Sequence, residues 1–135
     1  MADRAVMERV IREAYAARVA GDVDGVMQHF GPDAEFCIAG CPSASAVPCR
    51  ISGHDEVRSA MERLLTAFDF SDLEPVDMLI DGDRAVVHWK VAVRSASTGE
   101  SAETEIVDLF RFEGDKVVAM QQFADTALAQ RLLGQ

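Results

Sequence analysis

The sequence lacks long apolar runs, and it is poor in cysteine and in aromatic residues. Of its 135 residues, three are cysteine and 7% are aromatic. No stretch approaches the roughly 18 consecutive apolar residues that can span a bilayer as a helix. Residues 1–19 mix charged and apolar side chains, whereas a secretory signal has a continuous apolar centre. We therefore expect a cytoplasmic protein that makes no contact with a membrane.

The cysteines are too few and too unevenly placed for a disulfide framework or a metal site. Cys37, Cys41 and Cys49 are an odd number within a short stretch, and no histidine pair stands beside them. We predict three reduced thiols. The sequence also has no glycine-rich phosphate loop, so no cofactor and no metal are predicted.

Positive charge is scarce as well. The chain has 13 Lys and Arg against 23 Asp and Glu, which gives a formal net charge of −10. Nucleic acids and anionic membrane surfaces are bound mainly by Lys and Arg that neutralise phosphate, and no basic cluster offsets this average. Neither is an expected partner.

What the sequence does have is enough apolar residues, 49%, for one core, and we predict a single domain over residues 1–135. The spacing of these residues in the first half is helical. It predicts helices at Asp3–Ala20, at Val23–Phe30, and from a capping box of Ser52 and Asp55 to about Phe68. Between the last two we predict a short strand, Ala34–Ile38, and an irregular loop over Ala39–Ile51.

In the second half the period of the apolar residues changes to two, which is typical of strands. The predicted strands are Leu73–Ile80, Arg84–Ala96, Ser101–Phe112 and Lys116–Ala124, followed by a helical turn at Thr126–Leu133. Short connections between these strands predict an antiparallel meander. The order of elements predicts an α+β fold, in which three helices pack against a curved antiparallel sheet and enclose an apolar pocket.

One carboxylate breaks the pattern of the Ser101–Phe112 strand. The alternate positions that include Ile106, Phe110 and Phe112 form its apolar, inward face, and Asp108 belongs to the same set. A buried carboxylate must find a partner or stay protonated, because burial raises its pKa. A neutral acid could donate a hydrogen bond to a developing oxyanion, and a carboxyl group of partly raised pKa could act as a base. Alternatively, Asp108 caps a helix end or pairs with an arginine such as Arg18.

The chain resembles the nuclear transport factor 2-like superfamily, and within it the branch of the ketosteroid isomerases and the SnoaL-like polyketide cyclases. The resemblance covers nearly the whole chain. It is carried by Gly21-Asp22, by Asp33-Ala34, by the helix led by Gly53, and most sharply by residues 106–112 with Gly114 and Met120. It implies a cone-shaped sheet around a ligand pocket and a homodimer.

The resemblance also suggests roles for individual residues. The aspartic acid of the isomerase oxyanion hole falls on Asp108, where the family holds this acid protonated in an apolar site. The tyrosine of the same oxyanion hole falls near Tyr15, with one residue gapped before Gly21. The proton-shuttling aspartate of the family falls on Ile38, which cannot carry a proton.

The same register suggests which side chains contact a ligand. These are Phe36 and Ile38 on the first strand, Trp89 and Phe110 in the meander, and Met120 and Gln122 on the last strand. For Trp89 and Met120, plain core packing is the alternative.

Three functions remain open at this point. The first is an enzyme of the proton-transfer type, an isomerase, cyclase or dehydratase, that acts on an apolar carbonyl compound with Asp108 and Tyr15 as catalytic groups. The second is a non-catalytic module that binds an apolar small molecule. The third is a dimerisation domain without a meaningful pocket. Because outward positions of the long strands, such as Val107 and Leu109, are apolar, we also expect a homodimer through this sheet face.

Overall fold

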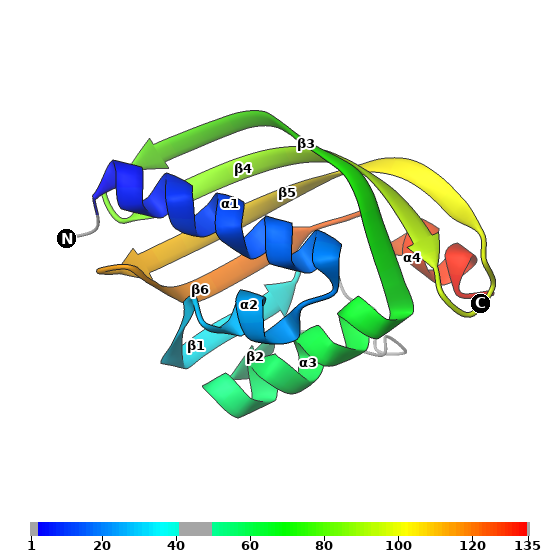
Figure 1. Cartoon of the computed structure of the whole chain (residues 1–135), viewed down its shortest axis with the longest axis horizontal. Coiled ribbons are helices and arrows are strands. Elements are labelled where there is room, and N and C mark those ends of the chain that lie inside the picture. Colours follow the sequence, from blue (N-terminus) through cyan, green and yellow to red (C-terminus); the bar gives the residue numbers. More distant parts are fainter. Residues whose placement is uncertain (1–2, 41–49, 135) are drawn as a thin grey trace.

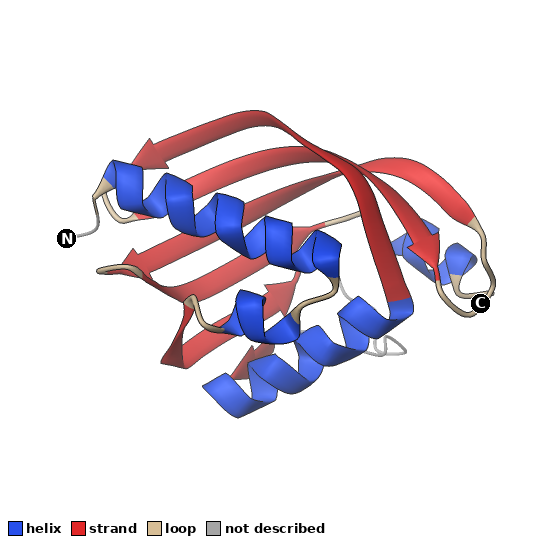
Figure 2. Cartoon of the chain, in the orientation of Figure 1, coloured by secondary structure: helices blue, strands red, loops and turns tan. Residues whose placement is uncertain are grey.

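The structure, a computed structural model, describes residues 3–40 and 50–134. Within these residues, three helices lie along one face of a curved sheet, and a fourth lies near the end of the β4–β5 hairpin (Figures 1 and 2). The helices are α1 (Arg4–Ala20), α2 (Val23–Met27), α3 (His54–Ala67) and α4 (Thr126–Leu132). No described helix is long and apolar enough to cross a membrane. The predicted α+β class is confirmed.

The sheet has six strands in the order β2-β1-β6-β5-β4-β3. They are β1 (Phe30–Ile38), β2 (Arg50–Ser52), β3 (Phe68–Asp81), β4 (Arg84–Ser95), β5 (Ser101–Glu113) and β6 (Lys116–Phe123). The meander β3-β4-β5-β6 is antiparallel, as predicted, and so is the β1–β2 pair. The β1–β6 pair is parallel, which the sequence analysis did not anticipate.

Helix α1 begins and ends as predicted. The Asp3 side chain accepts a hydrogen bond from the Ala5 amide and caps the first turn. Gly21 ends the helix with a φ of 73°, a left-handed conformation that glycine adopts without steric cost. Between these ends an apolar stripe is buried against the sheet: Met7, Val10, Ile11, Ala14 and Tyr15.

The second predicted helix is too long. Helix α2 ends at Met27, and β1 begins at Phe30, before the predicted strand start at Ala34. The sheet takes these residues because Phe30 pairs with Val117 of β6, and the Val117 amide donates to the His29 carbonyl. Pairing with a strand far along the chain therefore outweighs the local preference for helix.

The predicted capping box of α3 is wrong. Ser52 belongs to β2, where it pairs with Glu35, and the residue before the helix is Gly53, which makes no capping hydrogen bond through a side chain. The predicted loop, Ala39–Ile51, is also too long, because its last two residues, Arg50 and Ile51, belong to β2. Residues 41–49 of that loop, with Cys41 and Cys49, lie outside the described residues.

Strand β3 begins directly after α3 at Phe68, five residues before the predicted start at Leu73. Its pairing with β4 shifts between Ser71 and Glu74, and Asp72 has a φ of 51°. Such an irregularity is a β-bulge, which bends a strand. Because the bulge interrupts the alternation of side chains, the sequence pattern shows only the part of the strand that follows it.

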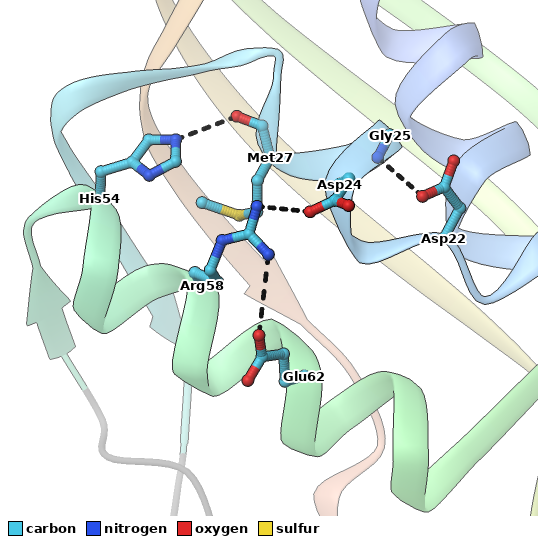
Figure 3. Close-up of polar contacts among 7 residues, drawn as sticks. All are labelled: Asp22, Asp24, Gly25, Met27, His54, Arg58 and Glu62. Atoms are coloured by element: carbon cyan, nitrogen blue, oxygen red, sulfur yellow. Dashed lines mark hydrogen bonds and ion pairs between the residues drawn. The ribbon is translucent and has the colours of Figure 1, made fainter.

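Helices α2 and α3 are joined by polar contacts (Figure 3). Arg58 of α3 lies 2.6 Å from Asp24 of α2 and 3.7 Å from Glu62 in its own helix. The His54 ring lies 3.1 Å from the Met27 carbonyl oxygen. Exposed ion pairs add little stability, but these contacts connect α2 to α3 through Arg58 and His54.

Candidate functional site

A cavity of about 180 Å³ lies between the sheet and the helices. Its wall takes side chains from α1, from the end of α3, from α4 and from strands β1, β5 and β6. Most of them are apolar. An engineered protein cavity of about 150 Å³ holds one benzene molecule, so a cavity of this size suits a compact ligand.

The concave face of the sheet places the predicted site residues in rows. Ile38 lies opposite Gln122, and Gln122 lies opposite Asp108, so one row crosses β1, β6 and β5. The neighbouring row contains Phe36, Met120 and Phe110. Since adjacent strands are about 4.8 Å apart, Ile38 and Asp108 stand roughly 10 Å from each other.

Six of the eight predicted site residues line the cavity: Tyr15, Phe36, Ile38, Phe110, Met120 and Gln122. The other two, Asp108 and Trp89, are buried but are not part of its wall. Trp89 is covered by Tyr15, whose ring centre is 4.2 Å from that of Trp89. Asp108 lies between Ile106 and Phe110, which both belong to the wall.

The side chain of Asp108 has no exposed surface. Burial raises the pKa of Asp108 to about 8, because the charged form loses its hydration. The Gln122 amide opposite lowers this pKa in part, yet neither carboxyl oxygen completes a hydrogen bond with any described residue. At pH 7 the Asp108 side chain is therefore mainly protonated.

The structural alternatives for Asp108 do not hold in the described residues. Its carboxyl group caps no helix there, and no arginine pairs with it. Arg18, the candidate partner, places its guanidinium over the ring of Phe70 instead.

Two further buried polar atoms at this place have no hydrogen-bond partner among the described residues. They are the hydroxyl of Tyr15 and the Nε1 of Trp89. Such atoms are rare in proteins, because most buried polar groups are hydrogen-bonded to protein or water. Unpaired groups on Tyr15, Trp89 and Asp108, around one apolar cavity, favour a site for a polar group of a ligand.

Arg18 is a cavity residue that the sequence analysis considered only as a partner for Asp108. Its guanidinium carbon lies 3.7 Å from the centre of the Phe70 ring, and Nη2 donates to the Leu64 carbonyl over 3.4 Å. Burial lowers the pKa of Arg18 to about 10, and Asp69 opposes this shift. The sequence did indicate that Arg18 faces the cavity, because it falls on the same helical stripe as Ile11 and Ala14.

No histidine takes part in the cavity wall. His88 lies on the outer face of the sheet, 2.7 Å from Glu105. Within residues 3–40 and 50–134, no cluster of His, Cys, Asp and Glu could hold a metal ion. The cavity wall offers a phenol, an amide and a guanidinium, and the buried neutral carboxyl of Asp108 lies between two wall residues; together these groups can donate hydrogen bonds and carry a proton.

Comparisons with known proteins agree with this fold. The sequence description of the SnoaL-like domain matches residues 11–120. No curated protein matches the chain. Among solved structures, an NTF2-like protein of unknown function from Burkholderia pseudomallei is 27% identical, with a TM-score of 0.84 over 96% of this chain and 98% of the other.

Two more distant structures share the fold. TerC, co-crystallised with polyporic acid, is 20% identical, with a TM-score of 0.82 over 96% of this chain and 99% of TerC. An LEH-like epoxide hydrolase from M. tuberculosis is 15% identical, with a TM-score of 0.72 over 95% of this chain and 88% of the hydrolase. One fold thus carries proteins of different description.

Proposed function

Because this chain belongs to the family of SnoaL-like domains, within the nuclear transport factor 2-like superfamily, we propose that it is a proton-transfer enzyme acting on a compact apolar carbonyl compound. The membership confirms the resemblance found in the sequence. The chemistry and the substrate class are our inference from the cavity, since the fold by itself hosts many functions.

The observation that carries the proposal is the protonated, unpaired carboxyl group of Asp108 beside an apolar cavity. A neutral acid can donate a hydrogen bond to a carbonyl oxygen. When solvent water or hydroxide takes a proton from the carbon next to that carbonyl, negative charge develops on the oxygen, and the donor stabilises this charge more strongly than the ground state. The unpaired hydroxyl of Tyr15 is the second donor in this proposal.

By the resemblance to ketosteroid isomerase, the proton-shuttling aspartate of that isomerase falls on Ile38, which lines the cavity with hydrocarbon. We therefore do not assign steroid isomerisation to this chain. A substrate with an acidic carbon, as in a cyclase-like reaction, needs a weaker base, and Asp108 itself can take that proton once it is ionised.

A substrate must reach Asp108 past the cavity wall. Gln122 lines the wall and lies directly opposite Asp108, so rotation of its amide would open the carboxyl group to the cavity. We propose that Gln122 moves in this way and then orients the carbonyl group of the ligand.

The test is exchange of the α-protons of cyclohexanone for deuterium, followed by NMR in D₂O. We expect the protein to accelerate this exchange over buffer, and Asp108→Asn to lose about 10²-fold or more of the acceleration. The outer-face variant Glu105→Gln, at an exposed position of the same strand, should keep it. An Asp108→Asn variant that exchanges at the wild-type rate would contradict the proposal.

A second candidate is a non-catalytic binding module, favoured by the hydrocarbon at Ile38. TerC, a neighbour of the same fold, was co-crystallised with polyporic acid. Binding of cyclohexanone without accelerated exchange would favour this candidate.

We also propose a homodimer formed through the outer face of the sheet. Outward positions of the strands carry exposed large apolar side chains: Leu79 at 61%, Leu109 at 38% and Phe123 at 44%. Val86 pairs with both Leu79 and Leu109, so these side chains form a continuous apolar band across β3, β4 and β5. A second copy of the chain is the occupant that we propose for this band.

A further inference from the structure

We propose that Arg18 selects ligands that carry an anionic oxygen, a carboxylate above all, on a compact apolar body. This inference rests on the proposed use of the cavity for a small molecule, and it names the class of that molecule. The ligand's ring or chain would fill the apolar part of the cavity, and its anionic oxygen would bind the guanidinium.

The first argument is position. Arg18 lies in the last turn of α1, three residues after Tyr15 and four after Ala14, and all three line the cavity. Side chains at this spacing share one face of a helix. The face that carries the proposed hydrogen-bond donor Tyr15 thus also brings a positive charge to the same cavity.

The second argument is orientation. The guanidinium carbon of Arg18 stands 3.7 Å from the ring centre of Phe70, which also lines the cavity. Stacking on a ring fixes the plane of the guanidinium and leaves its edges free for hydrogen bonds. A planar group held in this way can bind the two oxygens of a carboxylate side by side.

The third argument is charge. No described carboxylate lies within 4.0 Å of the Arg18 guanidinium, and Asp69, the acid that acts on it, is 3.5 Å from Arg94. Asp108 is neutral at pH 7, and the Oδ1 of Asp125, at an exposed part of the wall, accepts from the Leu128 amide over 2.9 Å. No described carboxylate therefore pairs directly with this partly desolvated cation, and a ligand carboxylate would supply a direct partner.

The alternative is that Arg18 serves only to cap the end of α3 through the Leu64 carbonyl. This hydrogen bond is long, 3.4 Å, and it uses one of the five N–H groups of the guanidinium. A capping arginine would have no influence on which ligands bind. The preference for a carboxylate over a neutral amide of the same shape therefore separates the two roles.

The experiment compares cyclohexanecarboxylate with cyclohexanecarboxamide, which are nearly equal in shape. Trp89 is the single tryptophan of the chain and contacts the cavity residue Tyr15, so its fluorescence reports binding at this place. We expect the wild-type protein to bind the carboxylate at least tenfold more tightly than the amide. Arg18→Gln should remove this preference by weakening the binding of the carboxylate far more than the binding of the amide.

Two further variants complete the test. Arg12→Gln, at an exposed position of the same helix, should keep the preference. Arg18→Lys retains the charge and should keep a smaller preference, which makes the test independent of whether Arg18→Gln folds.

Equal binding of the two probes by the wild-type protein, or an undiminished preference in Arg18→Gln, would overturn the role of Arg18 and leave the proposed proton-transfer function standing. Failure of the wild-type protein to bind either probe would overturn both, because the cavity would then not accept a compact apolar molecule.

Discussion

At the scale of single residues, Asp108 couples the stability of the protein to pH. A buried acid with a pKa raised to about 8 holds its proton in the folded state over a range where the unfolded chain has lost it. The stability that this group contributes is complete below the unfolded pKa of about 3.9 and is lost as pH rises through the folded pKa.

We predict that Asp108→Asn becomes more stable relative to the wild type as pH rises from 5 to 8. The wild type should lose up to about 1.4 kcal/mol of unfolding free energy per pH unit through this group, and the variant should lose nothing through it. Chemical denaturation of both proteins at pH 5 and pH 8 measures the difference. If the variant were instead destabilised most at pH 8, Asp108 would have to be ionised and paired.

Tyr15 provides a second prediction at this scale. Its buried hydroxyl has no partner among the described residues, so removing it leaves no new unpaired group. We expect Tyr15→Phe to keep or slightly raise the unfolding free energy, yet to slow the α-proton exchange of cyclohexanone by about tenfold or more. A clear loss of stability with unchanged exchange would show that the hydroxyl has a structural role.

The residues of the cavity could be predicted from the sequence to the extent that strand alternation places them. Alternation put Asp108, Phe110 and Gln122 on one face, and the structure places them there. It could not show that Tyr15 covers Trp89, because the spacing of apolar residues within a helix or a strand does not show which helix residue packs on which strand residue. It also could not show that Arg18 stacks on Phe70, since the β-bulge hides the start of that strand.

At the scale of elements, the N-terminal ends of helices α1 and α3 differ in how they are capped. The Asp3 side chain accepts from the Ala5 amide over 2.8 Å, whereas Ser52 lies in β2 and caps nothing. We predict that Asp3→Ala costs about 1 kcal/mol of unfolding free energy, while Ser52→Ala changes it by less than about 0.5 kcal/mol. Denaturant titration of both exposed-site variants checks this, and equal losses would contradict it.

The elements that local sequence signals define were predicted well, and those that depend on distant pairing were not. Helix α1 has its own cap, stripe and terminal glycine, and the turns of the meander carry their own glycines. The first residues of β1 form a strand because they pair with β6. Strand β2 likewise forms through its pairing with Glu35–Cys37. No window of neighbouring residues contains that information.

At the scale of the whole molecule, the apolar band on the outer face predicts the state of assembly. We expect light scattering to give twice the 14.7 kDa mass of one chain at micromolar concentration. Leu109→Glu should shift this mass toward the monomer, because it buries a charge in the contact. The exposed Leu79→Ser change should have a smaller effect in the same direction, and a monomeric wild type would contradict the dimer.

The parallel pair of β1 and β6 has a consequence for the order in which the ribosome delivers the chain. Strand β1 emerges before the other five strands, whereas its neighbour β6 emerges after all of them (Figure 1). Until then Ile38 has no Gln122 beside it, and one side of the cavity does not exist. Long-range pairing of this kind slows folding, so the nascent chain carries an open apolar surface until β6 has been made. The site can therefore bind a ligand only after β6 has joined the sheet.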